Sequence, residues 1–413
     1  MLNYISSLPD LAYALRRPRR LVVLGATGSI GRSALEVVAA QEGLFRILAL
    51  AGGKNVRLLA EQAEKWRPAF LAVQDEQAGK ALAGLLSYKA EVLIGQEGYV
   101  ALASLPEADL VLSAQVGAAG LRGTLAAIRA GKVVALANKE SLVLAGDLVR
   151  EECRKSRACI LPVDSEHNAI FQCLAGIAES SGDWPGQNGQ ALKRIILTAS
   201  GGPFRGKSRE FIAQATRQAA LAHPTWNMGA KITVDSASMM NKGFEIIEAC
   251  HLYGLSAGQV EVLVHPQSIV HSLVEYQDNS QLAQLGRPDM RIPISVCLGW
   301  PNRIQSGGGQ LNLLQVPPLS FEAPDEELFP ALNLCREAFS GGRGLTIALN
   351  AANEVAVNLF MEDKLSFTGI SELAGKVLDA WRENAAPRTV EQILALDAQA
   401  RRMALEAGGA YEN

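Results

Sequence analysis

The chain has 413 residues, more than one hydrophobic core usually organises, and its 48% of hydrophobic residues is ordinary for a globular enzyme. A formal net charge of -3 excludes the broad positive field that holds nucleic acid or an anionic membrane, so neither is expected as a partner. The six cysteines lack the close spacing of a zinc site or redox motif and favour a reducing cytoplasm. No apolar run approaches the ~20 residues of a membrane span.

The chain begins with a segment, residues 1–19, that we interpret as an N-terminal extension of unknown role. It runs into the basic cluster RRPRR (16–20) and has no long apolar stretch. A short transit peptide is the alternative interpretation.

Residues 20–163 alternate short β-branched runs with helix-like segments. The runs are RLVVLG (20–25), FRILAL (45–50), AFLAV (69–73), DLVLSA (109–114), KVVALA (132–137) and CILPV (159–163). Such alternation predicts an α/β domain whose parallel sheet is covered by helices on both faces, as in Rossmann-like domains.

Residues 164–300 follow a different pattern, with predicted strands joined by tight turns. These strands are KRIILTA (193–199), KITV (231–234), QVEVLVH (259–265) and SIVHSLVEY (268–276). The pattern predicts a central α+β domain with a largely antiparallel sheet. Glycine, proline and asparagine at 182–189 predict an exposed loop.

Residues 301–325 form a predicted linker, and 326–413 a predicted α-helical bundle. Apolar positions in this last region recur at helical spacing in four blocks, which span 328–339, 345–359, 370–380 and 390–403. The bundle contains little obvious chemistry.

A glycine-rich turn after the first predicted strand suggests a nucleotide site. GATGSIG places Gly25, Gly28 and Gly31 between a strand and a helix, in a variant of the GxGxxG spacing. Glycine there lets the backbone approach a pyrophosphate, whose charge meets the helix N-terminus. The alternative is that the glycines only permit tight packing.

The second predicted strand ends in GGKN (52–55) instead of the acid that binds the ribose of NAD. Lys54 and Asn55 suit the 2'-phosphate of NADPH. At the end of a later strand, ANKES (137–141) places Asn138, Lys139 and Glu140 where the cofactor site should continue. A surface ion pair is the alternative for Lys139 and Glu140.

Two acidic segments predict a metal site. In LPVDSEHNAI (161–170), extended backbone would direct Asp164 and Glu166 to one face and Ser165 elsewhere. The alternative is a helix cap at Asp164 or Ser165. His167 is expected to be structural, as are His251, His265 and His271.

The second segment, ITVDSASMMNKGFEIIEA (232–249), puts Asn241, Lys242 and Glu245 on one side of a helix. An exposed ion pair is the alternative. Three carboxylates without a histidine or thiolate favour Mg²⁺ or Mn²⁺ over zinc.

Phosphate-binding and lid candidates complete the site. Ser200 begins the turn SGGPF, whose backbone amides suit phosphate, with side-chain donors expected from Ser236, Asn241 and Lys242. HPTWNMG (223–229) has the makings of an aromatic lid in His223 and Trp226. A capped turn and a packed indole are the alternatives for these two residues.

Over roughly residues 20–405 the motifs together resemble the 1-deoxy-D-xylulose 5-phosphate reductoisomerases. The matching motifs are GATGSIG, GGKN, ANKES, PVDSEHNAIFQ, SGGPFR, HPTWNMG, VDSASMMNKGFE, HPQS and ALNAANE. The resemblance implies a homodimeric enzyme of the non-mevalonate isoprenoid pathway. It would use NADPH and a divalent metal, Mn²⁺ or Mg²⁺, to convert that phosphorylated sugar to 2-C-methyl-D-erythritol 4-phosphate.

The resemblance also implies roles for individual residues. Cofactor-binding positions match Thr27, Gly28, Ser29, Ile30, Gly53, Lys54, Asn55, Asn138, Glu140 and Gly229. Metal ligands match Asp164, Glu166 and Glu245. Substrate contacts match Lys139, Ser165, Glu166, Ser200, His223, Ser236, Asn241, Lys242 and Glu245, and the catalytic set is Lys139, Glu166, His223 and the lid residue Trp226.

The hypothesis is a metal-assisted rearrangement of the carbon skeleton followed by reduction of the resulting aldehyde by NADPH. Two alternatives stay open. One is an NADPH-dependent reductase of another phosphorylated carbonyl compound, although simple hydride transfer needs no acidic triad. The other is a nucleotide-sensing binding module.

Overall fold

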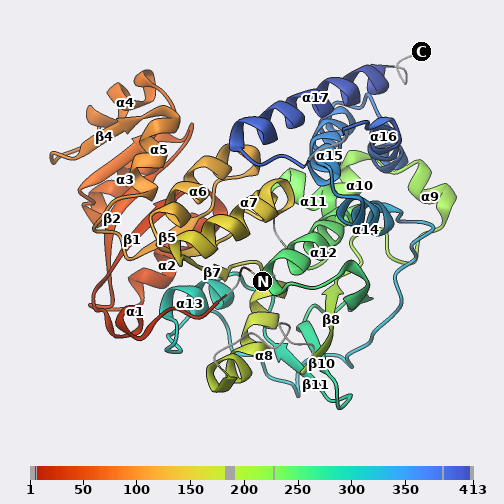
Figure 1. Ribbon diagram of the computed structural model, residues 1–413, viewed down its shortest axis with the longest axis horizontal. Coiled ribbons are helices and arrows are strands. Elements are labelled where there is room, and N and C mark those ends of the chain that lie inside the picture. Colours follow the sequence, from red (N-terminus) through yellow and green to blue (C-terminus); the bar gives the residue numbers. More distant parts are fainter. Residues whose placement is uncertain (1–4, 6, 182–190, 227, 384–385, 410–413) are drawn as a thin grey trace.

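The computed structural model describes residues 5, 7–181, 191–226, 228–383 and 386–409 (Figure 1). The predicted loop at 182–189 lies outside these residues. The N-terminal part is built on a seven-stranded parallel sheet of order β4-β3-β2-β1-β5-β6-β7. Its strands are β1 Arg19–Leu24, β2 Phe45–Ala51, β3 Phe70–Val73, β4 Glu91–Ile94, β5 Leu110–Ser113, β6 Val133–Leu136 and β7 Cys159–Pro162.

Helices connect these strands in the predicted alternation, which confirms the Rossmann-like fold. They are α2 Ser29–Ala39, α3 Val56–Trp66, α4 Glu76–Ala83, α5 Gly95–Ala103, η1 Gly117–Gly120, α6 Leu121–Arg129 and α7 Glu140–Ser156. Every residue of β5, β6 and β7 is buried, as expected for strands covered on both faces. The strand order reverses between β1 and β5, so the carboxyl ends of these two strands flank the crevice where such sheets bind ligands.

A second, mixed sheet of four strands has the order β11-β10-β8-β9. Its strands are β8 Leu192–Ala199, β9 Val260–Val264, β10 Val270–Tyr276 and β11 Gln281–Leu285. Strand β10 is antiparallel to both of its neighbours, whereas β8 and β9 are parallel. The predicted turn after β10 leads into β11, which the sequence pattern had not indicated.

One predicted strand of this region is wrong. The run KITV (231–234) lies inside helix α11 Ala230–Ala237. Its β-branched residues are accommodated because Thr233 donates its hydroxyl to Gly229 O at 2.9 Å and Val234 is fully buried in the core. Tertiary packing therefore outweighs the strand propensity of this short run.

The remaining helices of this region are α8 Ser165–Ser181, α9 Arg209–Ala213, α10 Arg217–Leu221, α12 Met240–Tyr253, η2 Ala257–Gln259 and α13 Arg291–Gly299. Among them, α8 and α12 pack against the mixed sheet, α13 packs against α2, and α9 lies beside the C-terminal helices (Figure 1). Every residue of α12 except Asn241 is buried, so its polar side chains must find partners inside the protein.

The C-terminal region contains the four predicted helices, drawn in blue in Figure 1. They are α14 Ala331–Gly341, α15 Leu345–Met361, α16 Phe367–Ala380 and α17 Val390–Gly409. Small buried residues such as Ala348, Ala352 and Ala356 let α15 pack closely against its neighbours. Among the described residues, no helix is both long enough and apolar enough to cross a membrane.

The described residues from Ile5 to Arg19, the first residue of β1, pack across the molecule and include the short helix α1 Leu11–Leu15. The buried Ile5 donates its N–H to Leu252 O at the end of α12, at 3.0 Å. Arg19, only 1% exposed, donates to Leu298 O at 2.6 Å and Trp300 O at 2.5 Å, and its guanidinium lies 4.3 Å from the Tyr13 ring centroid. The segment thus joins the parallel sheet to α12 and α13.

Candidate active site

The glycine turn between β1 and α2 has the geometry of an anion-binding turn. Gly25 has a φ of +88°, and a Cβ there would lie 2.5 Å from Ala114 O. A Cβ on Gly31 would lie 2.3 Å from Gly25 O, so only glycine lets the helix approach the strand. Gly28 caps α2 without a side chain, which leaves the N–H groups of the first turn available to a pyrophosphate.

The end of β2 supplies an amide and a cation next to this turn. Asn55 caps α3 by accepting the N–H of Leu58 at 3.1 Å, and Lys54 beside it is exposed. No acid occupies 52–55, so nothing repels a 2'-phosphate there. This arrangement fits NADPH better than NADH.

The turn after β6 joins the cofactor side to the acidic cluster. Asn138 donates to Gly117 O at 3.0 Å and accepts the N–H of Ser141 at 3.2 Å, which fixes the start of α7. Lys139 and Glu140 follow, and their side chains enter two different polar networks. Lys139 reaches acids of both acidic segments, Asp164 and Glu245, whereas Glu140 accepts from Lys231 of α11 at 3.3 Å.

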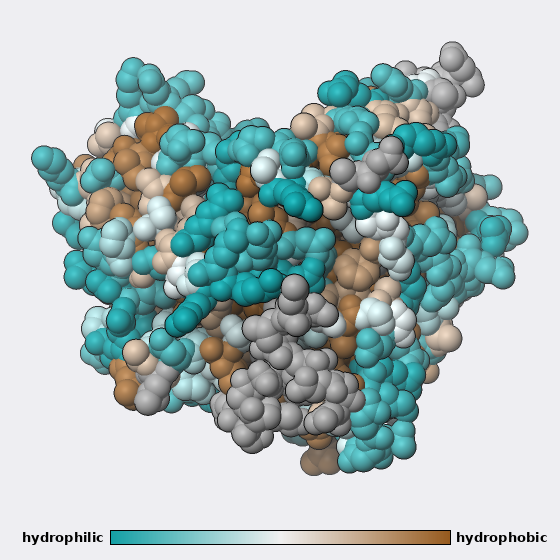
Figure 2. All heavy atoms as spheres, viewed as in Figure 1, coloured by the Kyte–Doolittle hydropathy of each residue, from teal (hydrophilic) through white to brown (hydrophobic). Residues whose placement is uncertain are grey.

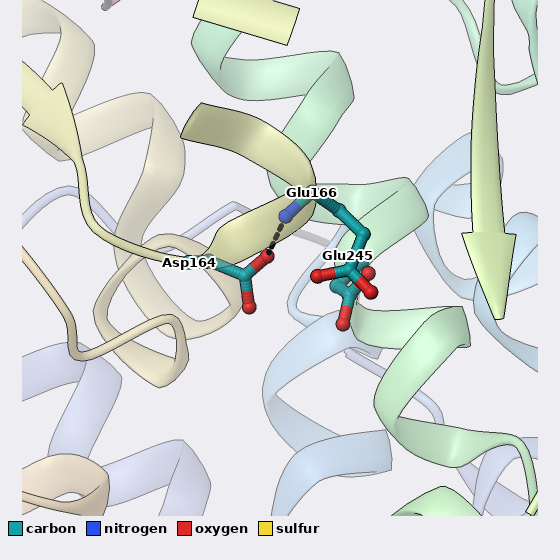
Figure 3. A group of neighbouring side chains, drawn as sticks. All are labelled: Asp164, Glu166 and Glu245. Atoms are coloured by element: carbon teal, nitrogen blue, oxygen red, sulfur yellow. Dashed lines mark hydrogen bonds between the residues drawn. The ribbon is translucent and has the colours of Figure 1, made fainter. Parts of the chain in front are cut away.

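Three carboxylates converge from the end of β7, the first turn of α8 and α12, as Figure 3 shows. Asp164, Glu166 and Glu245 each offer an oxygen, and these oxygens lie within 4.8 Å of one another. Asp164 also accepts the N–H of Glu166 at 3.2 Å. The helix cap and the acidic cluster are therefore the same feature.

The expected extended geometry of this segment is wrong, because Ser165 and Glu166 already belong to α8. The helical turn brings Glu166 over Asp164, and the Ser165 hydroxyl donates to the Glu166 carboxylate instead of pointing elsewhere. The hydrogen bond that caps the start of α8 thus places the two acids side by side.

Two buried lysines hold the cluster together. Lys139 donates to Asp164 at 2.7 Å, to Asn241 at 2.9 Å and to Glu245 at 3.2 Å. Lys242 donates to Glu166 at 2.8 Å and closely to Glu245. Burial lowers the pKa of both lysines, but the surrounding carboxylates outweigh it and raise each pKa, that of Lys139 well above its ordinary value.

The pKa values of two of these carboxyl groups are shifted in opposite directions. Burial raises the pKa of Asp164, but Lys139, His167 and Lys242 outweigh it, so the net pKa is lowered. For Glu245, burial and the charges of Asp164 and Glu166 together raise the pKa. Three acids facing two ammonium groups leave an excess of negative charge, and oxygen donors of this kind fit a hard divalent cation.

The ring of His167 lies outside this cluster. Its Nε2 is 3.1 Å from Glu248 Oε2, and both side chains are almost fully buried. Burial lowers the pKa of His167, but Glu248 outweighs it and the net pKa is raised. Glu248 is one helical turn beyond Glu245, a spacing that could have identified it from sequence.

The predicted phosphate turn lies beside His223. Gly201 and Gly202 have φ values of +83° and +66°, and Gly202 N donates to Ser200 Oγ at 3.2 Å. A Cβ on Gly202 would lie 3.0 Å from Ser236 O, so Ser236 is a neighbour of this turn. A cavity of about 390 Å³, lined in part by Ser200, Phe204 and Pro224, opens next to it.

Hydrogen bonds define the tautomer of His223. Its Nδ1 accepts the N–H groups of Thr225 at 3.2 Å and Trp226 at 2.9 Å, so the proton of the neutral ring is on Nε2. That nitrogen lies 3.0 Å from Ser200 Oγ. Burial lowers the pKa of His223, which favours this neutral form.

The other predicted residues are distributed between these two regions. Asn241 donates to Glu245 at 2.6 Å, so Asn241 and Lys242 lie at the carboxylate cluster in this structure. The Trp226 ring centroid is 6.3 Å from that of His271. Gly229 caps α11, two residues before Lys231, a residue that the sequence analysis did not single out.

Comparison with known proteins gives consistent matches along the chain. Family models described as 1-deoxy-D-xylulose 5-phosphate reductoisomerase and its C-terminal domains match residues 21–146, 160–253 and 285–403. The chain is 57% identical to the 1-deoxy-D-xylulose 5-phosphate reductoisomerase of Oleidesulfovibrio alaskensis, covering 99% of this chain and 100% of that one. It is 53% identical to that of Lawsonia intracellularis, covering 97% and 98%.

Comparison with solved structures gives matches to the same family. A crystal structure of DOX-P reductoisomerase in complex with NADPH, fosmidomycin and magnesium has a TM-score of 0.90 and 43% identity, covering 95% of this chain and 98% of that one. The Zymomonas mobilis enzyme in complex with NADPH has a TM-score of 0.87 and 42% identity, covering 96% and 100%. This chain therefore belongs to the 1-deoxy-D-xylulose 5-phosphate reductoisomerase family.

Proposed function

We propose that this protein isomerises and reduces 1-deoxy-D-xylulose 5-phosphate to 2-C-methyl-D-erythritol 4-phosphate, with NADPH and Mn²⁺ or Mg²⁺, in the non-mevalonate isoprenoid pathway. The observation that carries the proposal is the convergence of Asp164, Glu166 and Glu245 within 4.8 Å, with Lys139 reaching them from the cofactor side. A metal centre next to a dinucleotide turn suits a reaction that combines rearrangement with hydride transfer.

The cofactor would be held by the two glycine turns, the Asn138–Glu140 turn and the residue before α11. These residues are Thr27, Gly28, Ser29, Ile30, Gly53, Lys54, Asn55, Asn138, Glu140 and Gly229. The uncapped start of α2 and the acid-free end of β2 support this assignment. NADPH bound there would supply the hydride.

The divalent cation would be held by Asp164, Glu166 and Glu245, where it would stabilise negative charge on neighbouring oxygens of the substrate. Lys139 and Lys242 donate to these carboxylates and offset part of their negative charge. Lys139 and Glu166 are also the groups that we assign to proton movement at substrate hydroxyls.

The substrate would bind between the carboxylate cluster and the Ser200 turn, with Lys139, Ser165, Glu166, Ser200, His223, Ser236, Asn241, Lys242 and Glu245 as contacts. Neutral His223 can share its Nε2 proton with a phosphate oxygen or with Ser200. Trp226, tied to His223 by its backbone N–H, would cover the site and exclude water.

The test follows NADPH oxidation with 1-deoxy-D-xylulose 5-phosphate, with and without Mn²⁺ or Mg²⁺, and identifies the product. We expect metal-dependent turnover to the branched polyol phosphate. Reduction without rearrangement would favour the simple reductase, and tight NADPH binding without turnover would favour the nucleotide sensor.

We further propose that the protein is a cytoplasmic homodimer. Strand β11 is an edge strand with Leu282 50% and Leu285 37% exposed, and the segment after α13 exposes Leu314 at 95%. Hydrophilic side chains dominate the face drawn in Figure 2. Exposed apolar side chains that gather at a sheet edge are typical of an interface. Light scattering coupled to size-exclusion chromatography should give twice the chain mass.

A further inference from the structure

Lys231 connects two turns that are far apart in the sequence. It lies in the first turn of α11, two residues after Gly229, and its Nζ is 3.3 Å from Glu140 Oε1 at the start of α7. The same Nζ is 3.1 Å from Asp235 Oδ2, one helical turn further along α11. Lys231 therefore joins the segment that follows Trp226 to the turn that contains Asn138.

The ion pairs of Lys231 with Glu140 and Asp235 are partly buried, which makes them stronger than an ion pair exposed to solvent. The Lys231 side chain is 26% exposed, whereas those of Glu140 and Asp235 are 13% and 3% exposed. Its Nζ also lies 5.6 Å from the ring centroid of the buried Phe244. Burial lowers the pKa of Lys231, but Asp235, Glu140 and Glu354 outweigh it and raise the pKa. Removing the ammonium would leave two carboxylates facing each other with little solvent.

Asp235, the partner of Lys231 on α11, is held in turn by helix α15. Asp235 accepts a hydrogen bond from Asn353 at 2.8 Å, and both side chains are buried. The next residue, Glu354, pairs with Arg401 of α17 at 2.5 Å. Glu354 also lies beside the turn after β5, since a Cβ on Gly117 would be 3.5 Å from its Oε1. The C-terminal helices thus brace the cofactor side of the site.

We propose that Lys231 is a positioning residue that holds the two halves of the NADPH site, the Asn138–Glu140 turn and Gly229, at a fixed separation. This inference rests on the proposed function, which assigns Glu140 and Gly229 to the cofactor. Lys231 acts through its two carboxylate partners and makes no contact with the carboxylate cluster. Its loss should therefore affect cofactor binding and leave metal binding intact.

The experiment compares Lys231→Met and Lys231→Arg with Lys193→Met, a matched control in which a lysine paired with Glu275 at 2.6 Å is lost from β8. The dissociation constants of NADPH and NADH are measured by nicotinamide fluorescence on the metal-free protein. The Mn²⁺ dissociation constant is measured by electron paramagnetic resonance, and the melting temperature is recorded for each variant.

Lys231→Met should weaken NADPH and NADH equally, by about tenfold, the scale of losing a part-buried charge pair. Lys231→Arg should recover most of the loss, and Mn²⁺ affinity should be unchanged in both. Asp235→Asn, which keeps the hydrogen bond but removes one charge, gives a second measurement if Lys231→Met melts early.

Wild-type NADPH affinity in Lys231→Met and Asp235→Asn would overturn the inference. A loss confined to NADPH would also overturn it, because that would mean direct contact with the 2'-phosphate. If the unaltered protein bound no NADPH, the proposed function itself would fail, and the two failures are thus distinguishable.

Discussion

At the scale of single residues, the ammonium groups of Lys139 and Lys242 pair with the same carboxylates that a divalent cation would bind. Both donate to Glu245, and together they also pair with Asp164 and Glu166. The two ammonium groups thus offset part of the negative charge of the three carboxylates. A cation must compete with two ammonium groups, which sets its affinity below that of three unpaired carboxylates.

Glu245→Gln tests the cluster directly. The amide keeps the shape but removes one anionic ligand, so we expect metal-dependent turnover to be lost and the Mn²⁺ dissociation constant to rise by more than about tenfold. NADPH affinity should not change. Glu275→Gln, a buried acid of β10 that pairs with Arg194 at 2.8 Å, is the control. Normal turnover in Glu245→Gln would remove this residue from the site.

Lys54→Ala tests the 2'-phosphate assignment. Because the exposed ammonium would contact only the extra phosphate, we expect NADPH to bind about tenfold more weakly and NADH to be unaffected. Lys65→Ala, which removes an exposed lysine from the last turn of the following helix α3, should change neither dissociation constant. Equal losses for both nucleotides would contradict the assignment.

The sequence indicated which acidic residues lie together, but not which kind of backbone structure carries each of them. Val-Asp-Ser at 163–165 and at 234–236 looks alike, yet the first leads from β7 into the start of α8 and the second lies within α11. Residue type predicts a ligand, whereas the backbone that carries it depends on packing with distant segments. Lys231 was missed because the strand predicted at 231–234 hid its i,i+4 pairing with Asp235, and because its other partner, Glu140, is 91 positions away.

At the scale of elements, the turn from β1 into α2 depends on two close approaches of backbone to backbone. Gly31→Ala would put a methyl group 2.3 Å from Gly25 O and against Ala26. We expect a loss of about 1–3 kcal/mol in the free energy of unfolding, together with weaker NADPH binding. Urea unfolding and nucleotide fluorescence measure the two effects.

Gly176→Ala on α8 is the matched control for this substitution. Among the described residues, nothing outside the helix's own backbone lies within 4 Å of its Cβ position, so alanine should stabilise the helix by up to about 1 kcal/mol. Similar behaviour of the two variants would show that the turn after β1 tolerates a side chain, against the close packing inferred here.

Strands with a continuous apolar run were predictable, including β7 and β9 at sheet edges, whereas two edge strands without such a run were not. The apolar runs at β1, β2, β5, β6 and β7 are largely buried and correspond to the predictions. Strands β4, EVLI, and β11, QLAQL, lie at sheet edges with mostly exposed or half-buried residues, so they lack a continuous apolar signal. The four C-terminal helices were predictable because their apolar positions recur at helical spacing.

At the scale of the whole molecule, buried neutral histidines connect stability to pH. Burial lowers the pKa of His271 to about 4, from an ordinary value near 6.5. As the pH falls below 6.5, the unfolded chain gains a proton that the folded protein does not. Stability is therefore full above this value and declines toward pH 4, by up to about 3 kcal/mol for this group.

Urea unfolding midpoints at pH 7.5, 6 and 5 check this expectation. We expect the midpoint to fall with pH, and His271→Gln should show a shallower decline than the unaltered protein. An identical pH dependence in the variant would assign the acid sensitivity to other groups, such as His251, whose pKa burial also lowers to about 4.

The packing of the residues before β1 has a practical consequence for anyone who shortens this chain. The family model begins at residue 21, so a trimmed version starting there would follow the usual boundary. It would remove Arg19, whose guanidinium satisfies the carbonyls of Leu298 and Trp300, and would uncover the backbone of Leu252 at the end of the helix that bears Glu245. In this protein the described residues ahead of residue 21 are part of the scaffold, and affinity tags are better attached before the whole segment than in its place.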